Sequence, residues 1–389
     1  MKSLPTKKYL LHGLLVALGI VGYNLTGCQG NSGTCGADND FPPHPIRQGV
    51  SAPFAGFIGN RLVVGGGCNF PDTPAAEGGK KVFYADVFAC SVGTSEGAAS
   101  SSEGTVVAQS LQWNPLASLP LTVAYGSSAE TPLGLVCMGG TNTDGALKKV
   151  FICKQGAKGL LWESLPDLPE NIDNAASTSL GNRVFVTGGN QENGGNALYT
   201  LQLPTDTTWT KLTDYPGPKR IQPVLLASDD ALFLFGGFEV NPTSKETIIS
   251  NNYLVYRLTD KVWSEPNLLP AMADGSPRAL VGAAGTRIGG KLYLAGGVNY
   301  AIFKDAVEGK APANYMTQPA DWYQFSKDIL VYDVASATWE VIPHVDGFNK
   351  AGGCLLHQQG SLYMVCGEIK PGIRTSEIVK RSVKALLGE

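Results

Sequence analysis

The chain has 389 residues, of which 43% are hydrophobic and 16% charged, and its net charge at pH 7 is −3. Its 48 Gly and 24 Pro follow no three-residue period, which excludes a collagen-like chain, and the apolar content excludes a disordered one. The near balance of 30 basic and 33 acidic residues provides no cationic surface for nucleic acid. Many turns and many short strands are predicted.

The first element in chain order is an export signal. Lys2, Lys7 and Lys8 precede an apolar run at residues 9–23, which is shorter than a membrane-spanning helix requires. The run ends in Leu25-Thr26-Gly27-Cys28, which resembles a bacterial lipobox. We expect residues 1–27 to be a lipoprotein signal peptide and Cys28 to carry lipid, which would place the protein in the periplasm or on the outer membrane. An ordinary signal peptide with a coincidental cysteine is the alternative.

A polar segment follows, and we expect residues 28–48 to be a tether that includes a closing strand. Without Cys28 the chain keeps seven cysteines, an odd number that cannot form a complete disulfide framework. No CxxC pair occurs, and removal of the signal peptide with His12 would leave only His44, His344 and His357 as histidines. We therefore expect neither a metal nor another cofactor.

A short motif then recurs, in which four or five apolar residues precede a pair of glycines. The first glycines of three central copies lie at positions 139, 188 and 236, so the spacings are 49 and 48 residues, the period of a kelch-type blade. A tryptophan follows each of the first five copies and is expected to cover the adjoining blade. The predicted fold class is all-β, a six-bladed kelch-type β-propeller over residues 49–389. The motifs lie at residues 62–67, 136–140, 184–189, 233–237, 293–297 and 363–367, and the tryptophans are Trp113, Trp162, Trp209, Trp263 and Trp339.

The last repeat ends early. Its third strand is predicted at residues 376–383, but the chain stops at Glu389 without a tryptophan-bearing fourth strand. Residues near 36–43 could supply that strand, and pairing of the N- and C-terminal segments would then close the ring and cover the open edges.

One rim of the propeller is expected to carry the function. Antiparallel pairing places the loops after the glycine pairs and the residues that open each first strand on the same rim. Two long insertions, residues 68–80 and 298–326, fall there, and long loops on a rigid scaffold commonly bind ligands. The candidate binding residues at this rim are Arg220, Arg278, Asn69, Asn190 and Asn299.

One copy of the motif departs from the pattern. In Cys366-Gly367-Glu368 the glutamate is interpreted as replacing the second glycine of the pair, and a carboxylate near the crowded axis needs a partner or a task. Arg374 follows the turn formers Pro371 and Gly372, which can fold this cation back toward the carboxylate. A structural ion pair and a catalytic carboxylate both fit the pattern.

The residues around this carboxylate resemble a known family. Residues 367–375, Gly-Glu-Ile-Lys-Pro-Gly-Ile-Arg-Thr, are similar to the signature loop of the N-acetylneuraminate epimerases, which are sialic acid mutarotases. Residues 296–303 look like their neighbouring-blade motif, and residues 53–57 with 65–70 are similar to a third segment. That third segment follows the signature loop in the epimerases but opens the propeller here, so the chain resembles a cyclically permuted branch.

The resemblance implies an isomerase that interconverts anomers of a sialic acid, with Glu368 as the catalytic acid/base and Arg374 engaging the substrate. Arg220 and Asn299 would add to the pocket, although Arg220 could merely open a blade and Asn299 could merely cap a turn. The second blade opens with Leu121-Thr122-Val123-Ala124-Tyr125, without the arginine of the epimerase pattern, which leaves the identity of the sugar acid open.

The alternative is a non-catalytic kelch propeller that binds glycan or protein at the cell envelope, because a fold does not imply a function. Intact Glu368 and Arg374 favour the enzyme. The expected partner is a small sugar acid, without nucleic acid and with membrane contact only through the N-terminal lipid. A homodimer is left open.

Overall fold

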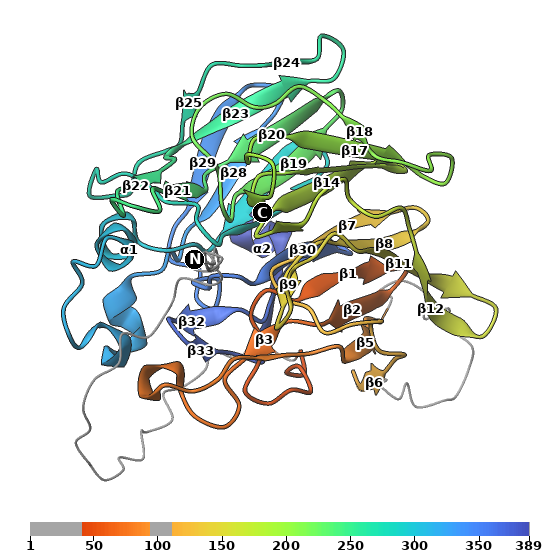
Figure 1. Ribbon diagram of the computed structural model, residues 1–389, viewed down its shortest axis with the longest axis horizontal. Coiled ribbons are helices and arrows are strands. Elements are labelled where there is room, and N and C mark those ends of the chain that lie inside the picture. The colour runs from red at the N-terminus through yellow and green to blue at the C-terminus, as the bar shows by residue number, and fades with distance from the viewer. Residues whose placement is uncertain (1–40, 94–110, 389) are drawn as a thin grey trace, which may run out of the picture.

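The computed structural model describes residues 41–93 and 111–388. Its main strands form six antiparallel sheets around one axis, and the first strands of neighbouring sheets contact one another there (Figure 1). The predicted all-β, six-bladed propeller is confirmed. Blade one comprises β1 (Phe54–Ile58), β2 (Arg61–Gly65), β5 (Val87–Ser91) and β6 (Trp113–Pro115), and blade two β7 (Ser127–Thr131), β8 (Gly134–Met138), β11 (Val150–Gly156) and β12 (Gly159–Ser164). Blade three comprises β14 (Ala176–Leu180), β15 (Arg183–Thr187), β17 (Leu198–Gln202) and β18 (Thr210–Lys211).

The last three blades follow the same order. Blade four comprises β19 (Val224–Ser228), β20 (Ala231–Phe235), β23 (Asn252–Arg257) and β24 (Val262–Trp263), with β25 (Asn267–Leu268) also paired to β23. Blade five comprises β26 (Ala284–Ile288), β27 (Lys291–Ala295), β28 (Ile329–Asp333) and β29 (Thr338–Ile342). Blade six has three strands in the described part of the chain, namely β30 (Cys354–Gln358), β31 (Ser361–Val365) and β34 (Ile378–Ser382), and helix α2 (Val383–Leu387) follows it.

The core lies between the blades. Leu62 and Val64 of β2 pack toward blade six, whereas Val63 between them packs toward blade two. Successive side chains of a strand point to opposite faces, and both faces of each blade are covered by a neighbour. This explains why the second strands are continuous apolar runs and show no alternation with polar residues.

The junction between the last and first blades repeats contacts found elsewhere in the ring. In each of blades one to five, a backbone N–H that follows the fourth strand donates to a carbonyl of the loop that leads into the third strand of the same blade. The donor and acceptor pairs are Leu119–Ala85, Leu168–Lys148, Tyr215–Asn196, Leu269–Asn251 and Val345–Lys327. The sixth bond of this kind runs from His44 N to Ser376 O at 2.7 Å. Residue 44 therefore takes the place in blade six that follows the fourth strand in the other blades.

The tryptophans support the same assignment. The indole N–H groups of Trp162, Trp209 and Trp263 donate to the carbonyls of Ala117, Pro166 and Thr213, each just after the fourth strand of the preceding blade. Trp113 of blade one donates to Pro42 O at 3.1 Å. Residues 41–43 carry no strand, and residues 36–40 lie outside the described residues, so a closing strand there stays a prediction.

Six backbone hydrogen bonds form a closed circuit at the axis. In every blade the residue two positions before the first strand has a left-handed backbone, with φ between +52° and +67°. Its N–H donates to the carbonyl of the same position in the neighbouring blade, and these six residues are called the axial ring. The bonds are Tyr125 to Ala52 (3.1 Å), Asn174 to Tyr125 (2.7 Å), Gln222 to Asn174 (2.9 Å), Gly282 to Gln222 (3.3 Å), Gly352 to Gly282 (2.8 Å) and Ala52 to Gly352 (2.6 Å).

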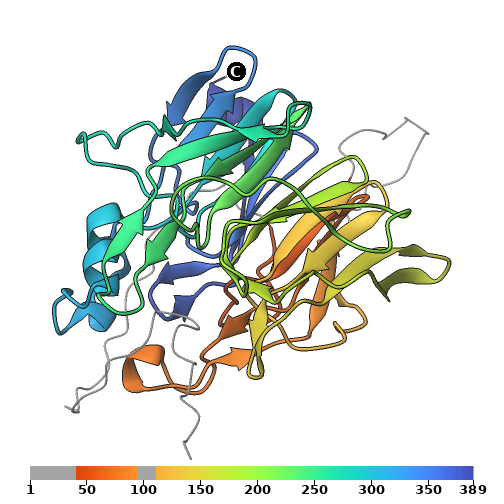
Figure 2. The ribbon, with the colours of Figure 1, turned by 45° about the horizontal axis from the view of Figure 1, so that its top comes forward.

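The predicted functional rim carries short two-stranded sheets and the two insertions. Helix α1 (Tyr300–Val307) and the 3-10 helices η2 (Tyr315–Thr317) and η3 (Ala320–Tyr323) belong to the insertion in blade five, and η1 (Ala75–Glu77) to that in blade one. Both views place α1, η1 and the last rim hairpin on the same side of the molecule (Figures 1 and 2). The rim pairs are β3 (Cys68–Asn69) with β4 (Val82–Phe83), β9 (Thr141–Asn142) with β10 (Gly145–Ala146), β13 (Ile172–Asp173) with β16 (Asn190–Gln191), β21 (Phe238–Val240) with β22 (Thr247–Ile249), and β32 (Glu368–Lys370) with β33 (Ile373–Arg374).

Candidate functional site

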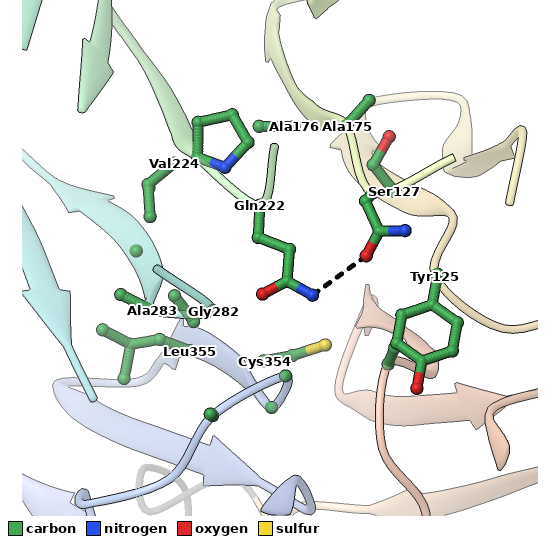
Figure 3. A pocket seen from close by; sticks show the side chains of 18 of the residues that line it. Tyr125, Ser127, Ala175, Ala176, Gln222, Val224, Gly282, Ala283, Cys354 and Leu355 are labelled. Atoms are coloured by element: carbon green, nitrogen blue, oxygen red, sulfur yellow. Dashed lines mark hydrogen bonds between the residues drawn. The ribbon is translucent and has the colours of Figure 1, made fainter. Parts of the chain in front are cut away.

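A cavity of about 440 Å³ lies at the axis and is lined by residues of all six blades. This volume suits a small molecule of monosaccharide size. All six residues of the axial ring line the cavity, and Figure 3 shows Tyr125 and Gln222 reaching it from different blades. The amide of Gln222 donates to Asn174 Oδ1 at 3.0 Å, so the polar wall is held by bonds between blades.

The structure corrects the register of the glycine motif in blade six. Both glycines of the other pairs have positive φ, and in blade six the two positive-φ residues are Cys366 (+53°) and Gly367 (+103°). The first glycine is therefore replaced by Cys366, and Glu368 follows the pair; the earlier interpretation of Glu368 as a substituted second glycine was wrong. Glu368 occupies the rim position that Cys68 has in blade one, because each forms a bridge to the residue just before the axial ring. Its extended backbone starts β32 and directs the carboxylate to the cavity.

Glu368 and Arg374 form an ion pair across the β32–β33 hairpin. They are directly opposed in the strand register, and Arg374 Nη2 lies 2.5 Å from Glu368 Oε1. The predicted Pro371–Gly372 turn thus brings the cation back to the carboxylate, with side chains only 2% and 6% exposed for Arg374 and Glu368. Arg374 Nε and Nη1 have no hydrogen-bond partner among the described residues. Burial raises the pKa of Glu368, while the charges of Arg374 and Lys81 act in the opposite direction.

A second cation and a phenol complete this cluster. Lys81 Nζ donates to the Tyr125 hydroxyl at 3.0 Å and lies 4.8 Å from the centre of the Tyr125 ring. Phe70 contacts both cations, with its ring centre 5.9 Å from Lys81 Nζ and 4.8 Å from Arg374 Cζ. Burial lowers the pKa of Lys81. The cluster around Glu368 therefore combines this carboxylate with the cations Arg374 and Lys81 and the phenol of Tyr125.

The insertion of blade five forms an aromatic wall of the cavity. Tyr315, Tyr323 and Phe325 line the cavity, and the rings of Tyr315 and Tyr323 pack edge to face with centres 5.3 Å apart. Lys370 Nζ connects this wall to the β32–β33 hairpin by donating to Gln318 O at 2.7 Å. The insertion of blade five, which the sequence placed at this rim, thus borders the cavity.

The structure brings some predicted binding residues to the cavity. Asn190 and Asn299 line it. Asn190 Nδ2 donates to Asp173 Oδ1 at 2.6 Å, and Asn299 caps helix α1 by accepting from Ile302 N at 3.1 Å. Asn299 therefore does cap a turn of the chain, and it also faces the cavity.

Three other predicted residues do not line the cavity, because their side chains serve the scaffold. Arg220 is 1% exposed, and its Nη1 donates to the carbonyls of Gly236 and Asn252. Arg278 forms an ion pair with Asp328 at 2.9 Å, and Asn69 Nδ2 donates to Gly49 O at 2.8 Å. Cys28 lies outside the described residues.

Sequence reasoning missed Tyr125, Asn174 and Gln222. The signal that could have found them is their constant place, two residues before each first strand, where the chain turns at the axis. Lys81 has no such signal, since it reaches the site from the end of an insertion.

Comparison with known proteins points to one family. The model of the N-acetylneuraminate epimerase family matches residues 165–386. The N-acetylneuraminate epimerase of Haemophilus influenzae (strain PittEE) is 32% identical over 228 residues, which cover 55% of this chain and 58% of that protein. That of Pasteurella multocida (strain Pm70) is 31% identical over 223 residues, which cover 54% and 56%. The chain thus spans less than two thirds of the length of these curated relatives.

A solved structure titled "Structure of YjhT" shares the fold. It has a TM-score of 0.62 at 17% sequence identity, and the match covers 89% of this chain and 98% of that one.

Proposed function

The chain belongs to the N-acetylneuraminate epimerase family, and from this premise we propose that it is an isomerase that interconverts the anomers of a sialic acid without a cofactor. The observation that carries the proposal is the Glu368–Arg374 pair at the edge of a cavity of monosaccharide size. The family relatives named above bear the same activity in their names.

The chemistry needs a group that both accepts and returns a proton. The anomeric hydroxyl of a 2-keto sugar acid loses its proton, the bond between C2 and the ring oxygen breaks, and the ring oxygen takes a proton. Rotation about the bond from C2 to C3 and closure on the other face of the carbonyl yield the other anomer. Glu368 is placed to accept the first proton and to return it after closure.

The surroundings of Glu368 suit this work. Burial raises the pKa of Glu368, which makes the carboxylate a better base, while the charges of Arg374 and Lys81 favour its ionised form. Around Glu368, the two cations Arg374 and Lys81 exceed this carboxylate in charge, which favours an anionic group of the sugar beside it, although a second carboxyl group, that of Glu130, also lines the cavity. The amides of Asn190, Asn299 and Gln222 offer hydrogen bonds to its hydroxyl groups.

The test is Glu368→Gln, assayed by exchange NMR between the anomers of N-acetylneuraminate. Gln keeps the shape of the side chain but cannot accept a proton, so we expect the acceleration to fall by roughly 10²-fold or more. Glu163→Gln, an exposed change on blade two, is the matched control and should exchange at the parent rate. A folded Glu368→Gln variant as fast as the parent would make the pair structural, and a non-catalytic platform would then be the better function.

We further propose that the chain is exported and anchored in the bacterial envelope by lipid on Cys28. The lipobox-like order of residues 25–28 supports this. Within residues 41–93 and 111–388, no helix is long and apolar enough to cross a membrane. Detergent partitioning of the parent and of Cys28→Ala tests the anchor, and an equally membrane-bound variant would refute it.

A further inference from the structure

Tyr125 stands where the family resemblance predicts a difference. The opening of blade two lacks the arginine of the epimerase pattern, and the residue that reaches the cavity from there is Tyr125. A tyrosine at φ +57° is strained; blades five and six have glycine at the equivalent position, and blades one, three and four have the smaller Ala52, Asn174 and Gln222. The backbone conformation thus favours glycine, yet the position carries a phenol.

Lys81 provides a reason for that phenol. Its Nζ donates to the Tyr125 hydroxyl, and no carboxylate lies within ion-pair distance of it among the described residues. A lysine held against a tyrosine oxygen and ring stabilises the negative charge that develops when the phenol gives up its proton. The position of Lys81 is fixed on its other side by the ring of Phe70, which Arg374 also contacts.

We propose that Tyr125 is the second proton-transfer residue of the site, working together with Glu368, and that Lys81 is the positioning residue that stabilises its phenolate. This inference rests on the proposed mutarotase function. Ring opening requires two proton transfers, and we assign one to Glu368 and the other to Tyr125.

The proton balance is complete with these groups. Glu368 takes the proton of the anomeric hydroxyl as the C2–O bond to the ring oxygen breaks, and the Tyr125 hydroxyl gives its proton to that oxygen. The open-chain keto sugar then lies between a protonated Glu368 and a Tyr125 phenolate bonded to Lys81. On closure the phenolate takes the proton from the attacking hydroxyl, and Glu368 returns its proton to the new anomeric oxygen. No oxidant, reductant or other reactant is needed.

The properties of Tyr125 match the role of acid. Burial raises the pKa of Tyr125, and the neighbouring Cys68 and Glu368 add to this effect while Arg374 opposes it, so the phenol is protonated before each turnover. The ring oxygen gains alkoxide character as its bond to C2 breaks, and an alkoxide is a strong enough base to take the proton of a phenol. The carboxyl group of Glu368 is more acidic than the phenol, so it is the group that starts in its ionised form and acts as the base.

The experiment measures kcat and KM for anomer exchange of N-acetylneuraminate by NMR with the parent chain, Glu368→Gln and four further variants. For Tyr125→Phe, which keeps the ring, we expect kcat to fall by roughly 10²-fold while KM changes by less than about threefold. Lys81→Met should lower kcat by roughly 10-fold or more, and Lys81→Arg should recover most of the loss because it restores the charge. Tyr84→Phe is the matched control, since it removes another phenol hydroxyl, bonded to Asn69, beside the same insertion; it should keep the parent kcat.

The outcomes separate the two proposals. A parent chain that does not accelerate exchange refutes the proposed function. A parent that is active, with Glu368→Gln inactive and Tyr125→Phe fully active, refutes only the inference. A rise in KM at unchanged kcat for Lys81→Met would assign Lys81 to substrate binding and overturn its role beside Tyr125. Thermal melting checks folding, and if Tyr125→Phe does not fold, the comparison of Lys81→Met with Lys81→Arg decides.

Discussion

At the scale of single residues, Arg374 acts on Glu368 more directly than on the cavity. Its Nη2 touches the carboxylate, but Arg374 is not among the residues that line the cavity. Burying an ion pair costs desolvation energy that the attraction only partly returns, so such a pair is weak evidence for a purely stabilising role. The charge of Arg374 holds the pKa of Glu368 below the value that burial alone would produce.

Arg374→Met should therefore move the pH dependence of catalysis. Without this cation the pKa of Glu368 rises, so the carboxylate is protonated at higher pH and the acidic limb of kcat/KM shifts upward, by about one unit or more. Arg374→Lys, which keeps the charge, should shift it less. The measurement is the exchange rate across pH 4.5 to 8. An unmoved limb together with a raised KM would mean that Arg374 binds the substrate.

His44 is a second buried titratable residue, and it belongs to the scaffold. It is 3% exposed, packs edge to face against Phe88 and Trp113, and accepts a hydrogen bond from Ile46 N through Nδ1. Burial lowers its pKa from 6.5 to about 4. The neutral form is thus favoured in the folded protein.

His44 should make the protein sensitive to acid. Because the folded pKa is depressed, its contribution to stability is present above pH 6.5 and is lost as the pH falls toward 4. The loss is on the order of 3 kcal/mol when each pKa unit counts for about 1.4 kcal/mol. His44→Leu, which installs the residue that three of the other blades have at this position, should abolish this part of the decline in urea unfolding between pH 7 and 4. The exposed His344→Asn change should leave the decline as in the parent, and equal declines in all three proteins would contradict the prediction.

How far the sequence predicts the site depends on whether a residue interrupts a pattern. Glu368 and Arg374 were found because the glycine pair before Glu368 is irregular, although the irregular residue is Cys366, and because a turn could return a cation to the carboxylate. Arg220 looked equivalent, but the structure places it inside the blade, where blades two and three have Val123 and Ile172, and its burial depends on partners such as Asn252 that lie far along the chain. Lys81 and Tyr125 meet only through the fold, so no spacing could reveal their contact.

At the scale of the blade, the glycine pairs are the element that sequence reasoning predicted best. They end the second strand, have positive φ, and sit where neighbouring backbones crowd together. The same close approach of backbones recurs in every blade, so the need for glycine was visible in the sequence as a repeated motif. The register in blade six was not visible, because Cys366 adopts a left-handed conformation that the sequence alone assigns to glycine.

Gly188→Ala should destabilise the propeller more than an equal change at Gly181. Both glycines lie in blade three with φ of +72° and +56°, so both variants pay the strain of a left-handed alanine. A Cβ on Gly188 would also lie 2.7 Å from Arg220 O, whereas a Cβ on Gly181 would meet nothing within 4 Å. We expect Gly188→Ala to lose about 1–3 kcal/mol more in the free energy of unfolding, measured in denaturant. Equal losses would show that the blades adjust to the added methyl group at no cost.

At the scale of the whole molecule, the N-terminal segment is expected to complete the last blade. Phe41 packs with Tyr363 and Ile378, and Pro42 and His44 make the contacts that follow a fourth strand elsewhere. The sequence predicted this closure from the missing strand alone, since a sheet edge left open is a liability.

Deleting residues 29–44 should lower the melting temperature and speed amide exchange in β34. The outward-facing amides of residues 378–382 would lose their cover, whereas deleting only residues 29–35 should leave both quantities as in the parent. Hydrogen exchange followed by mass spectrometry is the measurement. Unprotected amides at 378–382 in the intact chain would argue against a closing strand.

The axial ring also fixes the width of the channel. Each of its N–H···O=C bonds joins two neighbouring blades, and the circuit includes the bond from Ala52 to Gly352 that spans the ends of the chain. Parting of the blades at the axis would lengthen these bonds, each of which contributes roughly 1 kcal/mol, so the circuit opposes widening of the channel. The aperture is shaped by side chains instead: Tyr125, Asn174 and Gln222 narrow one half, and Ala52, Gly282 and Gly352 leave the other half open. We therefore expect the size of these side chains, more than the spacing of the blades, to limit which ligands pass the axis.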